Sequence, residues 1–187
     1  MDNNLKSLSA LGKPTALILQ IGPFKITERM NVALASLATR RGQGTEFKNR
    51  AQLAGVPLPP PATSERNDPF GAFWVTPEMW FIEAPLPMFE DIAAKLKAAF
   101  GDTASITEQT DAWVRFDLSA PNPSHLLERL SNIDVDRVPD GHASRTVIDH
   151  VGCYLIRRNA NEVTLYGPRS SANSLLHAIT VAAESLL

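Results

Sequence analysis

The single cysteine and the four histidines are the residues best suited to catalytic or metal chemistry. Cys153 follows His150 by three residues, and a thiol beside an imidazole can act as a nucleophile. On a β-strand, residues three apart point to opposite faces, so we interpret Cys153 as a small core residue. The histidines have no acidic residues near them at metal-ligand spacing, and we expect no zinc site at His125, His142, His150 or His177.

A second cluster, Arg169-Ser170-Ser171, stands directly before a segment with helical periodicity. Backbone amides at a helix N-terminus, two hydroxyl groups and a guanidinium can hold a phosphate or a carboxylate, including an acidic side chain of a partner. Ser170 or Ser171 can instead cap the helix, which is a frequent role of serine at such a position. We favour the cap and keep Arg169, Ser170 and Ser171 as candidates for a partner or anion contact.

Three tryptophans and one arginine form a further group of candidate contact residues: Trp74, Trp80, Trp113 and Arg115. Tryptophan is amphipathic and recurs at protein interfaces, so these rings are a candidate docking surface, although a place in the core is the first interpretation. Arg115 shares one face of a predicted strand with Asp117. We expect that face to be wet or at an interface.

The sequence contains no strong catalytic or nucleotide-binding motif. It has no Gly-x-Gly-x-x-Gly, no P-loop, no Gly-x-Ser-x-Gly and no Cys-x-x-Cys. We therefore assign no catalytic, cofactor-binding or metal-binding residue from sequence.

Composition places the chain among ordinary soluble globular proteins. Of its 187 residues 44% are hydrophobic and 20% charged, and the formal net charge is −2. Such a balance argues against nucleic acid or an anionic membrane as the main partner, because both favour dense positive charge. One cysteine allows no intrachain disulfide, and no run of about 18 apolar residues is present. We expect a cytoplasmic protein that neither spans a membrane nor is secreted.

Prolines suggest how the chain is divided. Five of the fourteen lie between residues 56 and 71, which we predict to be an extended loop. We expect residues 1–55 to be an N-terminal segment that contributes strands and a short helix, and residues 72–187 to be the main α+β body. At this length, one compact domain overall is the simplest expectation.

The pattern of the main body predicts an α+β fold. Residues 80–150 run strand, helix, strand, strand, helix, strand, which is the order of a ferredoxin-like split βαβ unit. Hairpins outnumber crossovers, so we expect an antiparallel or mixed sheet with helices on one face. Val32–Ala38 is ambiguous between strand and helix.

The last fifth of the chain is its most regular part. Two predicted strands, Gly152–Arg157 and Glu162–Tyr166, form a hairpin. An amphipathic helix follows. Its apolar residues recur at helical spacing and must be buried against a sheet: Ala172, Leu175, Leu176, Ile179, Ala183 and Leu186.

Five segments in this order resemble the gamma subunit of heterotetrameric sarcosine oxidase. They are Phe73–Trp80, Asp111–Arg115, Leu126–Asp134, Gly141–Thr146 and Gly167–Ala172. The resemblance extends from Ala72 to Leu187. Thr76 stands where the family commonly has glycine, and the N-terminal third is only loosely similar.

The resemblance implies a non-catalytic subunit of a complex that oxidatively demethylates sarcosine to glycine. That complex transfers the one-carbon unit to tetrahydrofolate, or releases it as formaldehyde, and produces hydrogen peroxide. FAD, FMN, NAD, zinc and tetrahydrofolate are then used in other subunits, and the expected partners are the alpha, beta and delta subunits. The gamma subunit is similar in fold to the folate-binding domain of the glycine cleavage T-protein.

Two other interpretations stay open at this point. Because the implied fold is shared with folate-dependent proteins, the chain can be a stand-alone folate-binding or one-carbon-transfer domain. It can also be a self-assembling scaffold.

Overall fold

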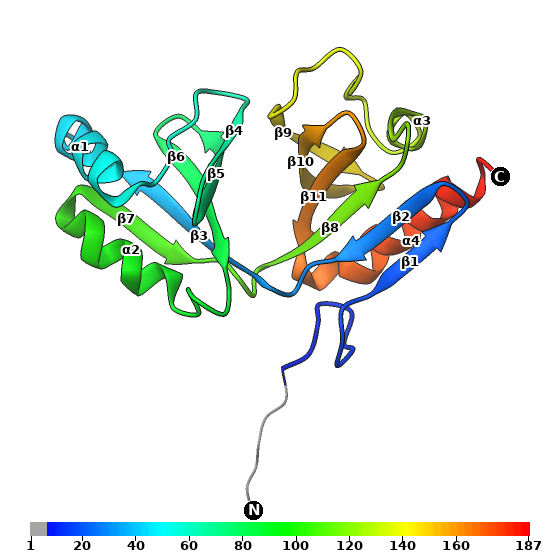
Figure 1. Cartoon of the computed structure of the whole chain (residues 1–187), viewed down its shortest axis with the longest axis horizontal. Coiled ribbons are helices and arrows are strands. Elements are labelled where there is room, and N and C mark those ends of the chain that lie inside the picture. Colours follow the sequence, from blue (N-terminus) through cyan, green and yellow to red (C-terminus); the bar gives the residue numbers. More distant parts are fainter. Residues whose placement is uncertain (1–6) are drawn as a thin grey trace, which may run out of the picture. The chain divides into compact units, whose positions relative to one another are not determined.

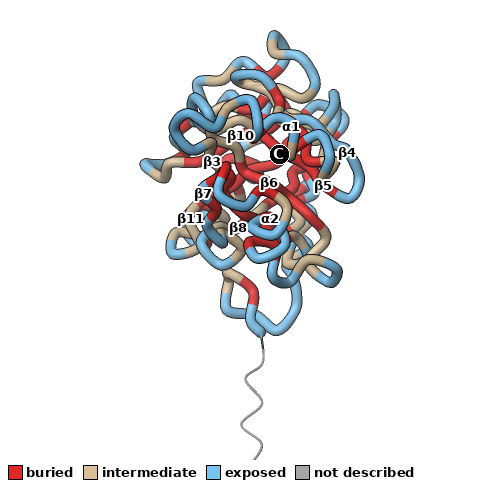
Figure 2. The backbone as a smooth tube through the Cα atoms, turned by 90° about the vertical axis from the view of Figure 1, so that its left-hand side faces the viewer, coloured by how far each residue is buried: buried red, intermediate tan, exposed pale blue. Residues whose placement is uncertain are grey.

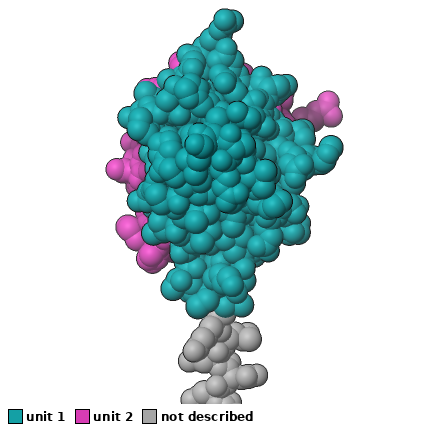
Figure 3. Space-filling view, turned by 90° about the vertical axis from the view of Figure 1, so that its right-hand side faces the viewer, with its two compact units in different colours: residues 1–30, 112–138, 146–187 teal, residues 31–111, 139–145 magenta. Residues whose placement is uncertain are grey.

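A computed structural model describes residues 7–187 of the chain. These residues form two compact units, and each unit is built from separate stretches of sequence. Unit 1 contains the described residues up to Met30 together with 112–138 and 146–187; unit 2 contains 31–111 and 139–145 (Figure 1; Figure 3 colours the two). Residues 1–6, which belong to the expected N-terminal segment, lie outside the described part.

Unit 1 is a six-stranded antiparallel sheet with helices on one face (Figure 1). In spatial order its strands are β1 (Ile18–Ile21), β2 (Phe24–Glu28), β8 (Trp113–Ser119), β11 (Glu162–Pro168), β10 (Val151–Asn159) and β9 (Ala143–Ile148). Its helices are α3 (Ser124–Leu127) and α4 (Ala172–Glu184).

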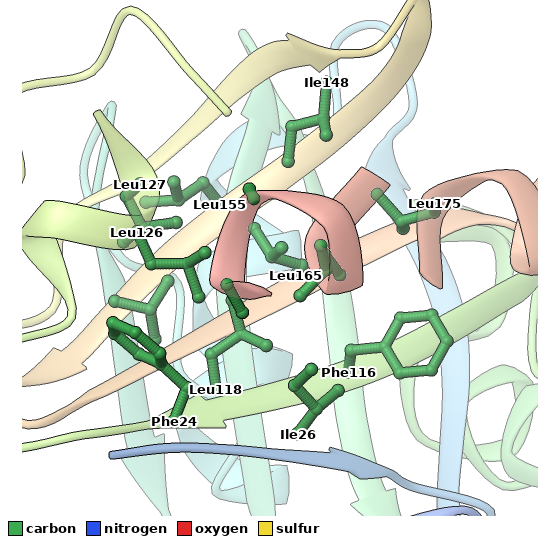
Figure 4. Close-up of a cluster of buried hydrophobic side chains, with 14 of the residues drawn as sticks. Phe24, Ile26, Phe116, Leu118, Leu126, Leu127, Ile148, Leu155, Leu165 and Leu175 are labelled. Atoms are coloured by element: carbon green, nitrogen blue, oxygen red, sulfur yellow. The ribbon is translucent and has the colours of Figure 1, made fainter. Parts of the chain in front are cut away.

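Helix α4 buries the predicted apolar stripe. Leu175 and Ile179 are fully buried against β-strand residues such as Phe116 and Leu165 (Figure 4). The hairpin before the helix is also confirmed, as β10 and β11, with a bulge near Arg157. The sheet that this helix requires is therefore its own hairpin extended by β8, β2 and β1 on one side and by β9 on the other.

Unit 2 is a five-stranded antiparallel sheet covered by two helices. In spatial order its strands are β4 (Ser64–Asn67), β5 (Phe70–Thr76), β6 (Met79–Pro85), β3 (Val32–Thr39) and β7 (Ala104–Glu108). Its helices are α1 (Gly44–Ala54) and α2 (Ile92–Phe100), and a 3-10 turn at Gly101–Thr103 follows α2.

The core of unit 2 lies between its helices and the sheet. The Phe47 ring of α1 lies 5.7 Å from the Trp80 ring and 5.1 Å from the Phe100 ring, measured between centroids. Leu96 and Ile82 belong to the same hydrophobic core and are almost fully buried. In Figure 2 the sheet strands β3 and β6 are coloured mostly as buried.

The α+β class and the ferredoxin-like unit are confirmed, but the unit lies earlier in the chain than residues 80–150. Its strand–helix–strand–strand–helix–strand order is β3, α1, β5, β6, α2, β7, and the spatial order β5-β6-β3-β7 is that of a split βαβ. Val32–Ala38 is a strand because β6 and β7 pair with it on both sides. Strand β8, expected in the same sheet as β6, pairs instead with β2 and β11.

The division of the chain differs from the boundaries 1–55, 56–71 and 72–187 expected from composition. The proline-rich loop lies inside unit 2, where it supplies strand β4, and Pro59 O accepts a hydrogen bond of 2.8 Å from Trp80 Nε1. The chain passes between the units near Met30, Ala112, Val138 and Arg145. No composition signal marks these passages, because they are set by which strands pair over long sequence distances.

No helix within residues 7–187 is long and apolar enough to cross a bilayer.

Gly167 is a test of how closely α4 lies on the sheet of unit 1. A Cβ atom at this position would lie 2.6 Å from Leu175 Cδ2 and 3.6 Å from Cys153 Sγ. We predict that Gly167→Ala lowers the free energy of unfolding by about 1–3 kcal/mol, because an added methyl overpacks the helix–sheet contact. Urea denaturation followed by circular dichroism measures this change.

Gly44→Ala is the matched control. No atom lies within 4 Å of a Cβ built at Gly44, which stands in the first turn of α1. We expect unchanged or slightly higher stability, since alanine has the higher helix propensity. Equal effects of the two substitutions would contradict the close packing at Gly167.

Candidate functional site

A cluster of charged and polar side chains lies on the face of the unit 1 sheet that points away from α4. Arg115 and Asp117 pair with Tyr166 and Thr164 on β11, whereas the intervening Phe116 faces the helix-covered core. We call Arg29, Arg115, Asp117, Arg158 and Thr164 the arginine–aspartate cluster. Its members come from or directly follow β2, β8, β10 and β11, so one polar group joins four strands.

Asp117 is the centre of the cluster. Its carboxylate accepts hydrogen bonds from Arg29 Nε at 2.7 Å, from Arg115 Nε at 2.8 Å and from Arg115 Nη2 at 3.1 Å. The Thr164 hydroxyl donates a fourth, at 2.8 Å, and itself accepts from Arg158 Nε at 3.0 Å. The Asp117 side chain is only 5% exposed, and Thr164 is fully buried.

Burial alone would raise the pKa of Asp117. The charge of Arg115 and the hydrogen bonds from Arg115, Thr164 and Arg29 outweigh that effect, so the pKa of this carboxyl lies below its ordinary value. Asp117 is therefore ionised at neutral pH and already accepts four hydrogen bonds. Such a carboxylate fixes its neighbours in place and is a poor proton acceptor in catalysis.

Aromatic rings border this cluster. The Arg115 guanidinium carbon lies 5.8 Å from the Tyr166 ring centroid, and the Trp113 ring lies 5.4 Å from that of Tyr154. Both tyrosines are buried. The sheet face that carries Arg115 and Asp117, which the sequence suggests to be solvent-exposed or at an interface, is thus buried from solvent at its centre.

Cys153 is fully buried beneath α4, as predicted for a core residue. Burial raises the pKa of its thiol to about 11, with a backbone hydrogen bond at Ile148 acting the other way. The thiol is therefore protonated at neutral pH and is not activated as a nucleophile. His150, its candidate base, is an exposed residue of the β9–β10 turn.

The four histidines stay apart in the structure. His142 shares a hydrogen bond of 3.0 Å with Ser144 Oγ, and partial burial lowers its pKa. The other three are exposed. In the part of the chain that the structure describes, no three His, Cys, Asp or Glu side chains are placed to hold a metal ion.

The serine cap expected before α4 is wrong. Arg169–Ser171 form a 3-10 turn, and neither serine side chain caps that turn or the helix that follows. Arg169 Nη2 instead donates to Leu8 O at 2.8 Å and to Ser9 O at 3.3 Å, which ties residues 8 and 9 to the turn before α4 within unit 1. Ser170 is exposed.

Glu28 reinforces this attachment from β2. It is 2% exposed, and its carboxylate accepts from the backbone amides of Leu17 at 3.1 Å and Leu11 at 3.4 Å. Residues 8–17 are therefore held at both ends, by Arg169 and by Glu28.

The three tryptophans are divided between the two units. Trp80 is partly buried and packs against the core of unit 2, close to the first interpretation of these residues, and Trp74, also partly buried, stands opposite it on β5. Trp113 belongs to unit 1 with Arg115 and Arg169. The candidate contact residues thus lie in both units.

Sequence reasoning identified two members of the arginine–aspartate cluster and missed the others. The alternation Arg115-x-Asp117 was visible as one strand face. Arg29 and Thr164 are 88 and 47 residues away from Asp117, so only strand pairing brings them to the carboxylate. No local pattern marks either residue.

Comparison with known proteins supports the fold. No protein-family model and no curated protein matches the sequence. Among solved structures, the chain is similar to a chain of the heterotetrameric sarcosine oxidase from Corynebacterium sp. U-96 in complex with pyrrole 2-carboxylate. The TM-score is 0.77 at 16% identity, over 90% of this chain and 87% of that chain.

The chain is also similar to the glycine cleavage system aminomethyltransferase T from Bartonella henselae. The TM-score is 0.62 at 12% identity, over 84% of this chain and 48% of that chain. The chain thus spans about half the length of the aminomethyltransferase. The fold that the sequence resemblance implies is confirmed by both likenesses.

Asp117→Asn tests the charge at the centre of the cluster. We predict a loss of about 1–3 kcal/mol in the free energy of unfolding at neutral pH, because three arginine hydrogen bonds lose their charged acceptor. Folding lowers the pKa of Asp117 below its ordinary 3.8. Below about pH 3.8 the unfolded state therefore binds more protons than the folded state, and the stabilisation that ionised Asp117 provides is lost as the pH falls further.

The stability difference between wild type and Asp117→Asn should therefore be full at neutral pH and shrink below about pH 3.8. Urea denaturation across this range measures it. Asp102→Asn is the matched control: Asp102 pairs with Arg40 at 3.4 Å but is fully exposed, and we expect no measurable change. A difference that grows with falling pH would contradict the ionised Asp117.

Proposed function

We propose that this chain is the non-catalytic gamma subunit of a cytoplasmic sarcosine oxidase complex. The observation that carries the proposal is the extent of the fold likeness. The similarity covers both units of this chain and 87% of one chain of a heterotetrameric sarcosine oxidase, so the two chains correspond almost end to end. The ordered sequence segments from Ala72 to Leu187 support the same subunit.

In this proposal the complex oxidatively demethylates sarcosine to glycine, with one-carbon transfer to tetrahydrofolate or release of formaldehyde, and produces hydrogen peroxide. The alpha, beta and delta subunits are the partners and hold FAD, FMN, NAD, zinc and tetrahydrofolate. This chain contributes structure. The protonated Cys153 and the saturated Asp117 support that role, because neither is prepared for nucleophilic or base chemistry.

Two of the candidate contact residues suit a role in docking. Trp74 is half-buried and Ser170 exposed, whereas Arg169, Arg115 and Trp80 make contacts that hold their own unit together. We propose Trp74 and Ser170 as contacts with partner subunits.

Co-expression tests the proposal. We expect the full chain, produced together with the alpha, beta and delta chains of a sarcosine oxidase, to co-elute with flavin absorbance in size exclusion. Trp74→Ala should reduce co-elution while the melting temperature of the isolated chain stays near wild type; Trp80→Ala, which removes a stacked core ring, should lower the melting temperature. A flavin-containing complex that forms without this chain, and leaves it in a separate peak, would refute the role.

A second candidate function is a stand-alone folate-binding domain. Its motivation is the likeness to aminomethyltransferase T, which covers 84% of this chain. Calorimetric titration of the isolated chain with tetrahydrofolate separates the two functions. We expect no saturable heat from the isolated chain, and stoichiometric binding would favour the second candidate over the first.

A further inference from the structure

The four sheet edges of residues 7–187 are not protected alike. Edge strands present unpaired backbone groups, and natural proteins commonly protect them with charged side chains. Strand β4 carries Glu65 and Arg66, β7 carries Glu108 and β9 carries Arg145. The remaining edge, β1, carries no charge, and none occurs from Thr15 to Pro23.

The hydrogen bonds of β1 show which of its residues face outward. Glu28 N donates to Leu17 O at 2.9 Å, so Leu17 is turned toward β2. Because orientation alternates along an antiparallel ladder, Leu19 and Ile21 are also turned toward β2, opposite Ile26 and Phe24. The backbone N–H and C=O groups of the residues between them, 18 and 20, point away from the sheet.

The side chains at this edge leave it open. Ile18 is 65% exposed, on the sheet face that does not carry α4. The Gln20 amide donates to Gly22 O at 2.7 Å and so lies along its own hairpin. The edge therefore offers an extended, uncharged backbone with one large apolar side chain beside it.

We propose that β1 pairs antiparallel with β1 of a second copy of this chain. The outward N–H and C=O groups at alternate residues of β1 can form hydrogen bonds with another extended strand. Strand β1 of a second copy is an extended strand of this kind. A twofold axis at Ile18 places that residue opposite its copy, an apolar cross-strand pair. No like charges meet at the contact. Lys25 lies on β2 opposite Gln20, and its copy is about 14 Å away across three strand spacings and about 13 Å away along the strand, beyond the screening length of about 8 Å at physiological salt.

This pairing gives a closed dimer. Each copy uses β1, the one uncharged sheet edge within residues 7–187, and the opposite edge of the same sheet keeps Arg145. An isologous contact of this kind does not propagate into fibres. The dimer concerns the chain alone and is independent of its proposed place in an oxidase complex.

Sedimentation velocity of the isolated full chain, from about 10 μM to about 1 mM, tests the pairing. We expect a reversible monomer–dimer equilibrium. Ile18→Lys places a charge on the edge and should weaken the dimer by at least about tenfold. Val147→Lys is the matched control, because Val147 is a 61% exposed β-branched residue on β9 at the other edge of the same sheet, and its substitution should leave the dimer unchanged.

Gln20→Pro separates edge pairing from folding. Proline removes only an N–H that points away from β2, so the β1–β2 hairpin keeps its ladder and the melting temperature should stay near wild type while the dimer is lost. Leu19→Pro removes a ladder hydrogen bond and should lower the melting temperature. The proposal is overturned by a wild-type chain that is monomeric throughout, by a dimer that Gln20→Pro leaves intact, or by equal effects of lysine at positions 18 and 147.

Discussion

Unit 1 depends on one strand, β8, that is paired on both sides with strands from distant parts of the chain. Asp117 stands at the middle of that strand, and its buried carboxylate binds side chains that β2, β8 and β11 supply. A carboxylate in such a place is stable only when its charge is paired and its oxygens are hydrogen-bonded. The correct register of β2 and β11 on β8 is therefore the condition under which Asp117 can be buried.

The opposite face of the same sheet follows the ordinary rule for α+β proteins. Helix α4 covers apolar residues of β8, β10 and β11, and it approaches so closely that a Cβ atom at position 167 would meet the Leu175 side chain. The two faces of the sheet thus constrain β8 differently. Apolar packing sets the distance between β8 and α4, and charge pairing sets which strands lie beside β8. Unit 2 reaches its fold by apolar packing of α1 and α2 on a split βαβ sheet.

The packing and charge pairing described above bear on function because they determine which side chains remain available for chemistry. Two groups that the sequence suggests for chemistry or anion binding are committed to structure: Cys153 to the core and Arg169 to residues 8 and 9. Asp117, which shares a strand face with Arg115, is committed to its arginines. The fold likeness extends almost end to end to one chain of a multi-subunit oxidase.

The sequence by itself determined the elements whose patterns are local. Helix α4, the hairpin β10–β11 and the core place of Cys153 follow from periodicity and turn residues, and so does the α+β class. Only the tertiary structure decided that Val32–Thr39 is an inner strand of unit 2, that β8 belongs to a different sheet from β6, and that Arg29 and Thr164 meet Asp117. The physical reason is that strand pairing and charge burial join residues far apart in the chain. The free energy that favours each pairing depends on both partners, whereas a local sequence pattern describes only one of the two.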